Sequence, residues 1–344
     1  MPSTLDAINM WSMYKTRRSK ALVVASLLTL TLCAQERIRF MSYNVENLFD
    51  CIDDTLTNDD PFLPEATRHW TRYRYWNKLQ AISSTIAMAG EDRAPDFVAL
   101  CEVENDSVMY DLTRRSSLRT AKYEYLITTS NDPRGIDVAL MHKTSTFRPF
   151  AHHSLRLPQE HISEGQHVRD ILLVSGELHM GDTIDLFVCH LPSRLNGKQS
   201  EKLRQRVVEY MCQAIDSITH ERTRPRIIVM GDFNDTPHKK SSLNPLTEKA
   251  GLTCITKDLN GSYRYKGQWE QIDHVYLSPT LLHSDDPSSL HLSPKGPWNF
   301  APAHLTEPEL RYGGLRPRRT YNGMRYEGGT SDHLPVCFDL WFNW

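Results

Sequence analysis

The sequence predicts an α/β fold in which stacked β-sheets are covered by helices. Many short runs rich in β-branched or aromatic residues are bounded by turn residues, which is typical of strands. Only two segments show the 3.6-residue periodicity of an amphipathic helix. Because these helices separate the strands only in part, the pattern argues against a doubly wound parallel sheet. With 344 residues and 40% hydrophobic content, one large domain is expected.

The predicted elements follow one another along most of the chain. The predicted strands are 38–45, 96–103, 123–128, 136–142, 168–178, 184–190, 226–230, 272–277 and 334–341. The predicted helices are 71–89 and 201–219, each with an apolar face at helical spacing. Segments 51–68 and 279–330 show no periodicity and are predicted loops. Loops of this length in a compact domain are usually functional or disordered, and we expect the second to lie beside the substrate.

The first 34 residues have the composition of an export signal. Basic residues between Lys15 and Lys20 precede a continuous apolar run at 21–32, and small residues near Ala34 offer a cleavage point. The apolar run is too short for a comfortable transmembrane span. We therefore expect residues 1–34 to be a signal peptide, residues 35–344 to form the mature domain, and the protein to be exported to the periplasm or the medium. A membrane anchor or a lipoprotein is the alternative.

The predicted mature chain is acidic. The full sequence has a formal net charge of −2, and residues 1–34 contain four basic side chains and one acidic one, so their removal lowers the charge to about −5. Nonspecific attraction to a polyanion needs a basic footprint. The charge therefore argues mildly against a high-affinity nucleic-acid binder.

The cysteines are expected to be mainly buried free thiols. Cys101, Cys189 and Cys337 lie within apolar, strand-like runs, where a free cysteine behaves as a small hydrophobic residue. Cleavage of the signal would leave six of the seven cysteines, which would permit a disulfide in an exported protein. The sequence contains no C-x-x-C motif or histidine cluster that suggests zinc.

Polar residues repeatedly follow the apolar runs. Five short polar strings lie at 43–47, 100–105, 189–194, 230–235 and 330–336. The first four end a predicted strand, the fifth precedes the last strand, and a sixth string at 271–274 opens a strand. Strand ends are where a rigid sheet can aim side chains into one pocket. Singly, an Asp or Asn after a strand is more often a turn former. Glu102 differs, because a carboxylate that follows the apolar run 97–101 needs a metal or a partner if it is buried.

Taken together, the strings form an ordered set. Its members are Asn44, Glu102, His190, Asp232 and Asn234 in a Gly-Asp-x-Asn motif, Asp273, and Asp332 and His333 in a Ser-Asp-His motif. With this set the sequence resembles the endonuclease/exonuclease/phosphatase superfamily, which includes DNase I, exonuclease III, inositol polyphosphate 5-phosphatases and bacterial sphingomyelinases. Segments 43–50 and 261–267 look like exported Bacteroidetes members with unassigned substrates. The resemblance covers about residues 38–340 and implies a four-layer α/β/β/α sandwich of two mixed sheets, the DNase I-like fold.

The resemblance also implies roles around a metal ion. Glu102 would be the principal ligand of Mg²⁺, which Mn²⁺ could replace, with Asn44 beside it and Asp332 close to the metal. Carboxylate and amide oxygens are the ligands that Mg²⁺ prefers. Asp232 would orient or deprotonate the attacking water, and Asn234 would hold that water or a phosphate oxygen.

The remaining roles belong to two histidines. His333, oriented and made more basic by Asp273, would donate to the scissile phosphate, and we expect these two residues on adjacent strands. His190 matches the histidine of the DNase, sphingomyelinase and inositol-phosphatase branches. The apurinic-endonuclease branch has no histidine there.

Three further residues are candidate phosphate ligands. Arg134 precedes a predicted strand, and Ser193 and Arg194 follow His190, so each is placed to bind phosphate or to lie on a solvated surface. Segment 311–326 mixes arginines with tyrosines, which suits an anionic substrate that carries a ring, although a plain surface loop is equally compatible.

The function expected from this set is a Mg²⁺-dependent phosphoesterase in which an Asp-activated water attacks phosphorus in line. A nuclease-type phosphodiesterase is slightly preferred. The alternatives are a phosphatase of inositol or sugar phosphates and a sphingomyelinase-like phospholipase C. A catalytically silent binding protein on the same fold is the alternative of another class, and loss of Glu102, Asp232 or His333 would have favoured it. The expected partner is a phosphate-ester substrate, nucleic acid included, with no stable membrane partner after cleavage, and the chain is expected to be a monomer.

Overall fold

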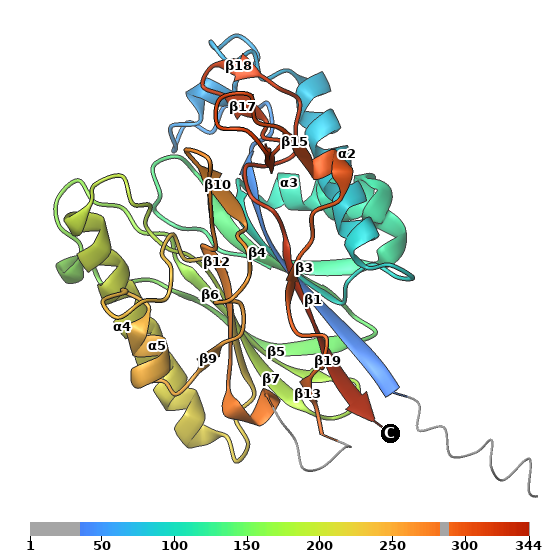
Figure 1. Ribbon diagram of the computed structural model, residues 1–344, viewed down its shortest axis with the longest axis vertical. Coiled ribbons are helices and arrows are strands. Elements are labelled where there is room, and N and C mark those ends of the chain that lie inside the picture. The colour runs from blue at the N-terminus through green and yellow to red at the C-terminus, as the bar shows by residue number, and fades with distance from the viewer. Residues whose placement is uncertain (1–34, 283–288, 344) are drawn as a thin grey trace, which may run out of the picture.

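Two mixed β-sheets pack face to face in the computed structural model, which describes residues 35–282 and 289–343 (Figure 1). The predicted signal peptide at 1–34 lies outside the described residues. The first sheet has the order β13 (His291–Leu292), β19 (Val336–Asn343), β1 (Gln35–Leu48), β2 (Phe97–Val103), β4 (Asp137–Lys143), β3 (Tyr123–Ile127), and β14 (Trp298–Asn299) also pairs with β19. The second has the order β5 (Phe147–Leu155), β6 (Ile171–Leu178), β7 (Thr183–His190), β8 (Ile227–Asp232), β12 (Asp273–Leu277), β9 (Thr253–Cys254).

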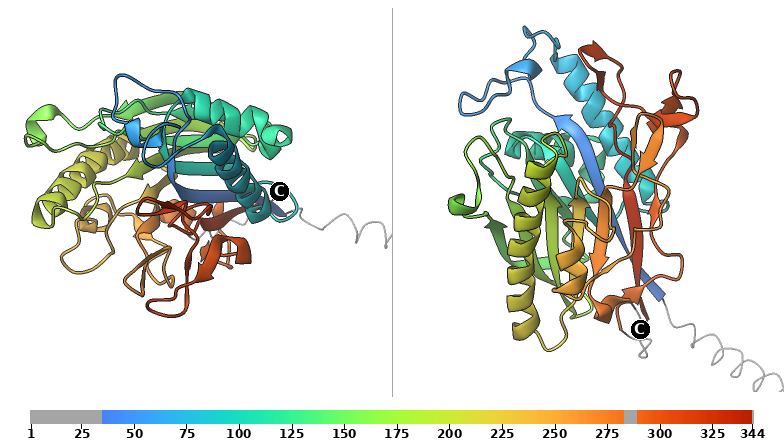
Figure 2. Two further views of the ribbon diagram at one scale, coloured as in Figure 1. Left: turned by 90° about the horizontal axis from the view of Figure 1, so that it is seen from above. Right: turned by 60° about the vertical axis from the view of Figure 1, so that its left-hand side comes forward.

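Helices cover the outer face of each sheet, which completes a four-layer sandwich (Figure 2). The first sheet is covered by α2 (Arg72–Ala89), with α3 (Asp106–Tyr110) at its end, and the second by α4 (Lys198–Glu221) and α5 (Asn244–Glu248). The α2 helix begins where the Thr71 side chain accepts the backbone N–H of Arg74. Single helical turns complete the connections: η1 (Asp60–Phe62), η2 (Asp111–Arg115), η3 (Ser117–Ala121), η4 (Gln159–His161), η5 (Pro279–Leu281) and η6 (Ala303–Leu305).

Apolar side chains fill each of the three interfaces between the layers. Between the sheets, the ring of Phe40 stacks on Phe97 at 4.6 Å and on Phe338 at 4.7 Å. Each buried side chain of this size contributes about 1.5–3 kcal/mol of transfer free energy. The predicted apolar faces of the two long helices point inward, through Leu79 on α2 and Val207 on α4. The periodicity of these segments therefore predicted which face meets the sheet.

The nine predicted strands and both predicted helices are present, with ends shifted by a few residues. The prediction missed β5, an edge strand in which Pro149 and exposed polar residues break the alternation, and also the short strands at 253–254, 263–265 and 268–270. Segment 279–330, predicted to have no element, contains short pieces of sheet. Besides β13 and β14 these are β15 (Thr306–Pro308), β16 (Leu315–Pro317), β17 (Tyr321–Asn322) and β18 (Arg325–Tyr326). Strands of two or three residues are too short to show periodicity.

Six cysteines lie in the described part of the chain, and all are unpaired there. Five of them are buried, as expected for small hydrophobic residues. Within residues 35–282 and 289–343, none of the helices combines the length and the apolar character that a bilayer span requires.

Candidate active site

One row across the second sheet carries three of the predicted catalytic side chains. The parallel pairing of β7 with β8 places His190 opposite Asp232. The antiparallel pairing of β12 with β8 places Asp273 opposite the same residue. Neighbouring strands lie about 4.8 Å apart, and paired residues point to the same face. The register of the sheet, rather than a loop, therefore brings these three side chains together.

Irregular backbone in the first sheet aims further polar side chains at this row. The pairing of β1 with β2 shifts register after Asn44, and the pairing of β2 with β4 shifts around Glu102. Glu46, Asn47 and Glu102 have φ angles of 51°, 52° and 64°, in the left-handed region that residues with a Cβ rarely adopt. Such bulges re-aim side chains and occur often beside active sites.

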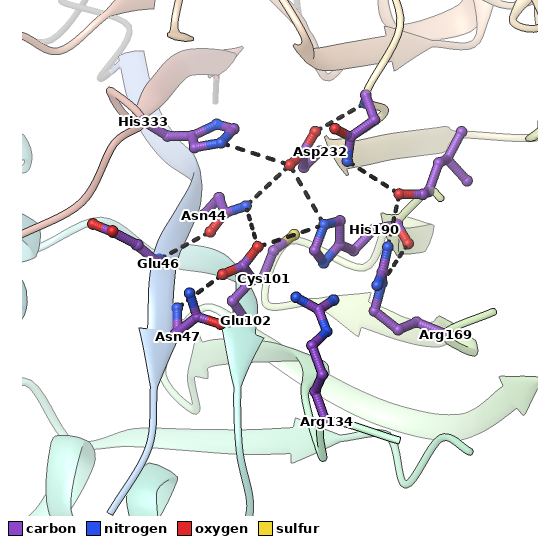
Figure 3. A network of polar contacts seen from close by, with 12 residues as sticks. Asn44, Glu46, Asn47, Cys101, Glu102, Arg134, Arg169, His190, Asp232 and His333 are labelled. Carbon is purple, nitrogen blue, oxygen red and sulfur yellow. Dashed lines mark hydrogen bonds and ion pairs between the residues drawn. The ribbon is translucent and has the colours of Figure 1, made fainter. Parts of the chain in front are cut away.

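Asp232 lies at the centre of the resulting network (Figure 3). Its Oδ2 accepts a hydrogen bond from Asn44 Nδ2 at 3.0 Å and lies 3.5 Å from His190 Nε2 and 3.8 Å from His333 Nε2. Its Oδ1 accepts the backbone N–H of Asn234 at 2.9 Å. Only 1% of Asp232 is exposed, and burial, with a further contribution from the neighbouring carboxylate of Asp273, raises the pKa of Asp232 to about 7, although His333 opposes the shift. The carboxyl is thus suited to take a proton near neutral pH.

His333 and Asp273 form a tight pair. His333 Nδ1 lies 2.7 Å from Asp273 Oδ2, and the Ser262 hydroxyl donates to the same oxygen at 2.5 Å. Burial alone would lower the pKa of His333, but Asp273 and then Asp232 raise it well above its ordinary value. The expectation that the pair lies on adjacent strands is wrong: Asp273 opens β12 in the second sheet, whereas His333 precedes β19 in the first. The pair therefore joins the two sheets at their ends.

His190 has the opposite surroundings. Burial lowers the pKa of His190 well below its ordinary value, and the nearby guanidinium groups of Arg169 and Arg134 lower it further. Arg169 Nε donates to the backbone carbonyl of His190 at 3.0 Å. His190 Nδ1 has no hydrogen-bond partner among the described residues. The imidazole is therefore neutral at neutral pH and can donate or accept one proton.

The acidic side of the site, formed by Glu46, Glu102 and Asp332, fits a hard divalent cation. Glu102 Oε1 lies 3.3 Å from Asn44 Nδ2, and Glu102 Oε2 accepts the backbone N–H of Asn47. Burial first, and then the carboxylate of Asp332, raises the pKa of Glu46 to about 7. Oxygen donors crowded in this way are the donor set that Mg²⁺ prefers.

Two cations border this acidic side. Arg319 Nη2 lies 2.6 Å from Asp332 Oδ2, and Arg319 Nε lies 3.6 Å from Glu46 Oε1. Lys78 donates to the carbonyl oxygen of Glu46, and burial lowers the pKa of Lys78 to about 8 although Glu46 and Glu102 oppose the shift. The raised pKa of Glu46 persists beside both cations. A divalent cation would therefore relieve an excess of negative charge.

A second cluster has the spacing of a metal site. One ligand atom each from Asp232, Asp273 and His333 lies within 4.8 Å of the others, so this trio could hold a metal ion by distance. However, His333 Nδ1 already contacts Asp273, and the raised pKa of His333 favours a protonated ring, which cannot ligate a metal. We interpret the trio as proton-handling groups, and Glu102, Asn44 and Asp332 remain the predicted metal ligands.

The predicted site residues surround one open cleft with a volume of about 900 Å³. Its lining includes Glu102, Arg134, His190, Ser193, Arg194, Asp232, Asn234, Asp332 and His333. Asn44 and Asp273 lie behind this lining and reach it through Asp232 and His333. Arg194 is already engaged, because its Nη2 lies 2.5 Å from Glu270 Oε2 and its Nε donates to the Asn234 carbonyl. Arg134 is half-exposed at 49% and points into the cleft, and its Nε lies 3.3 Å from Asp132 Oδ1 (Figure 3).

Sequence reasoning missed several residues that build this site. Asp132 links the two arginines beside His190, because its Oδ2 lies 2.8 Å from Arg169 Nη1 and its Oδ1 accepts the backbone N–H of Arg134. A signal for Asp132 was its place two residues before Arg134. Tyr263, whose ring centroid lies 5.0 Å from that of His333, lies in segment 261–267, which carried the resemblance but was assigned no role.

Comparison with known proteins supplies the final observation. A sequence model described as Endonuclease/Exonuclease/phosphatase family matches residues 39–341. No curated protein sequence matches the chain.

Several solved structures share the fold. An endonuclease/exonuclease/phosphatase family protein from Bacteroides thetaiotaomicron is 17% identical with a TM-score of 0.56, and the match covers 90% of this chain and 99% of that chain. A mannosyl-6-phosphatase from the same organism is 16% identical with a TM-score of 0.56 and coverages of 88% and 99%. D. rerio TDP2 complexed with a single-strand DNA product is 16% identical with a TM-score of 0.52 and coverages of 89% and 99%. These likenesses confirm the predicted DNase I-like sandwich.

Proposed function

Because the chain belongs to the endonuclease/exonuclease/phosphatase family and is therefore a hydrolase of phosphoester bonds, we propose that its cleft uses an Asp232-activated water for in-line attack on phosphorus. One observation carries the proposal. The buried Asp232 carboxylate lies between a neutral His190 and a charged His333, with Asn44 and the backbone of Asn234 fixing its two oxygens. This arrangement holds a proton acceptor in place before the reaction begins.

Four residues of the site, Asp232, His333, Asp273 and Arg134, have the following roles in this proposal. Asp232 takes the proton of the attacking water, because its raised pKa of about 7 makes it a better base than an ordinary carboxylate. The His333 imidazolium donates from Nε2 to a phosphate oxygen while Asp273 holds Nδ1. A charge-assisted donor that is fixed in advance stabilises the negative charge that grows in the transition state. Arg134, at the mouth of the cleft, binds a second phosphate oxygen.

A divalent metal held by Glu102, with Asn44 and Asp332 close by, would polarise the phosphate and neutralise charge on the leaving oxygen. We propose Mg²⁺, with Mn²⁺ as a substitute, since the donor set consists of oxygens. Asn44 directs its amide nitrogen at Glu102 and Asp232, and its Oδ1 accepts the backbone N–H of Glu46. Asn44 would therefore contribute to the metal site mainly by holding the Glu102 carboxylate in position.

We favour a phosphodiester as the substrate. The cleft is open and has arginines on its rim, which suits a substrate that continues beyond the phosphate on both sides. A phosphatase of sugar or inositol phosphates is the second candidate, and the mannosyl-6-phosphatase among the structural neighbours supports it. A panel assay with Mg²⁺ decides between them: DNA, RNA, bis-4-nitrophenyl phosphate, 4-nitrophenyl phosphate, mannose 6-phosphate, inositol phosphates and sphingomyelin. Turnover of the monoesters alone would reject the phosphodiesterase.

Replacing Glu102 tests the proposed metal site. Glu102→Gln removes a charge but little volume, so we expect an unchanged melting temperature without metal, weaker Mg²⁺ binding by calorimetry, and activity lower by about 10²-fold or more. High Mg²⁺ should restore part of the activity. Glu124→Gln is the matched control, since Glu124 is an exposed glutamate on β3 of the same sheet. Full activity of Glu102→Gln at low Mg²⁺ would reject the assignment.

We propose that the protein acts outside the cytoplasm as a monomer, with residues 1–34 removed. The basic, apolar and small residues follow one another there in the order of a signal peptide. Mass spectrometry of the native protein should find a mature N-terminus near Gln35 in the periplasm or the medium. An intact N-terminus in the soluble cytoplasmic fraction would contradict the proposal.

A further inference from the structure

We infer that the hairpin of β10 (Tyr263–Tyr265) and β11 (Gln268–Glu270) is a stacking wall for a flat ring carried by the substrate, with Tyr265 as its platform. The inference rests on the proposed function, because it assigns the cleft a phosphate ester whose alcohol bears a planar ring of the nucleoside type.

The two tyrosines of β10 share one face of the hairpin. Residues two apart on a strand point to the same side and lie about 7 Å apart. Both Tyr263 and Tyr265 line the cleft, and the Tyr263 ring lies 5.0 Å from the imidazole of His333. Tyr265 is 53% exposed, so its ring is available to a ligand. A phosphate beside His333 would thus have an open aromatic surface within about the reach of a ribose.

The opposite face of the hairpin is firmly anchored. Arg264 Nε lies 2.6 Å from Glu309 Oε2, and Arg264 Nη2 donates to the Gly313 carbonyl at 2.7 Å. Gly267 has a φ of 81°, and a Cβ there would lie 2.7 Å from Tyr312 Cβ, so the turn packs closely against the neighbouring loop. A wall held in this way binds a ring without first being ordered.

The polar groups beside Tyr265 favour a ring over a pattern of hydroxyl groups. Glu270 is paired with Arg194 at 2.5 Å, and Arg264 contacts Glu309 and the Gly313 carbonyl on the other face. The exposed amide of Gln268 lies opposite Tyr265, and one amide does not match the several hydroxyls of a free sugar. Stacking needs no directional partner and accepts any base. Lys266, 5.1 Å from the Tyr265 ring centroid, adds positive charge for an anionic substrate.

Two phosphodiesters with the same leaving group test the wall. Thymidine 5′-(4-nitrophenyl phosphate) carries a base, and methyl 4-nitrophenyl phosphate does not. Tyr265→Ala should lower the ratio of kcat/KM for the first ester over the second by about tenfold, through KM. Tyr265→Phe should keep the ratio, because it keeps the ring. Tyr73→Ala is the surface control, since Tyr73 is 75% exposed on α2 and outside the cleft lining.

Binding without turnover separates this inference from the proposed function. By calorimetry in the absence of metal, Tyr265→Ala should weaken binding of thymidine 5′-phosphate about tenfold relative to methyl phosphate. If wild-type protein cleaves neither ester, the proposed diesterase activity is rejected. The ratio of the affinities for thymidine 5′-phosphate and methyl phosphate still tests the stacking wall. An unchanged ratio in Tyr265→Ala would overturn the inference. A ratio lost equally in Tyr265→Phe would also overturn it, because recognition would then depend on the hydroxyl.

Discussion

His190 and His333 approach the same Asp232 oxygen from two sides of the cleft, at 3.5 Å and 3.8 Å, yet they differ in charge. Both are buried, so desolvation lowers the pKa of each. Around His190 the charged neighbours are Arg169 and Arg134, which lower its pKa further. Around His333 they are carboxylates, led by Asp273, which raise its pKa well above the ordinary value.

The difference shows that the neighbours, rather than burial, decide the role of a buried histidine. The charged ring of His333 gives the cleft a fixed proton donor at Nε2. The neutral ring of His190 gives it a group that can accept or donate a proton. Removing a charged neighbour of each ring, and comparing the result with removal of the ring itself, therefore tests the proposal.

The largest effect is expected on the charged side. Asp273→Asn and His333→Ala should each lower kcat by several orders of magnitude, and the double variant should be little worse than His333→Ala alone, because groups that act as a unit give non-additive losses. His190→Ala should instead multiply with either change, since Asp273 does not hold that ring. Steady-state kinetics of the single and double variants provide the measurement. Additive losses for Asp273 and His333 would show that they are not a pair.

A smaller effect is expected on the neutral side. Asp132→Ala leaves the Arg169 guanidinium buried without its carboxylate, so we expect about 3 kcal/mol lower unfolding free energy. It also removes the carboxylate oxygen that lies 3.3 Å from Arg134 Nε and orients that side chain, so we expect weaker inhibition by inorganic phosphate. Chemical denaturation and phosphate inhibition provide the two readouts. Asp216→Ala on α4 is the exposed control. Lower stability with unchanged phosphate inhibition would mean that Asp132 supports the fold alone and does not aim Arg134.

The smallest effect on activity is expected at a third buried histidine. Burial lowers the pKa of His274 to about 4, although Asp273 opposes the shift, and the ring contacts Thr256 Oγ1 and the Asp235 carbonyl. An unfolded histidine titrates near pH 6.5, so between about pH 6.5 and 4 the unfolded state binds more protons. Stability should therefore fall by about 3 kcal/mol as the pH falls through this window, and then level off.

His274→Gln removes this titration but leaves the catalytic groups in place. Denaturation curves from pH 7 to pH 4 should show a shallower decline for the variant than for the wild type. Equal pH dependence of the two proteins would show that His274 is not kept neutral by burial.

Much of the fold and most of the candidate site could be predicted from the sequence, because the signals are local. The apolar face of α2 and the polar string that ends β8 are each visible within one segment. Partners distant in sequence are not visible in this way. Asp273 and His333 were expected on adjacent strands, but they belong to different sheets. The order of strands along the chain does not say which sheet each strand joins. Tyr263 belongs to a strand of three residues, which is too short to show a period.

Four of the residues around the cleft, Glu46, Asn47, Glu102 and Asn234, adopt left-handed backbone conformations that side chains disfavour. Each such residue typically stores about 1 kcal/mol or more, so the cleft is where this protein gives up stability in exchange for geometry. A selection for heat resistance alone would therefore favour glycine at these positions, and at Glu102 that gain would remove the carboxylate itself. Engineering for durability should leave these four positions unchanged and look to the helices on the outer layers.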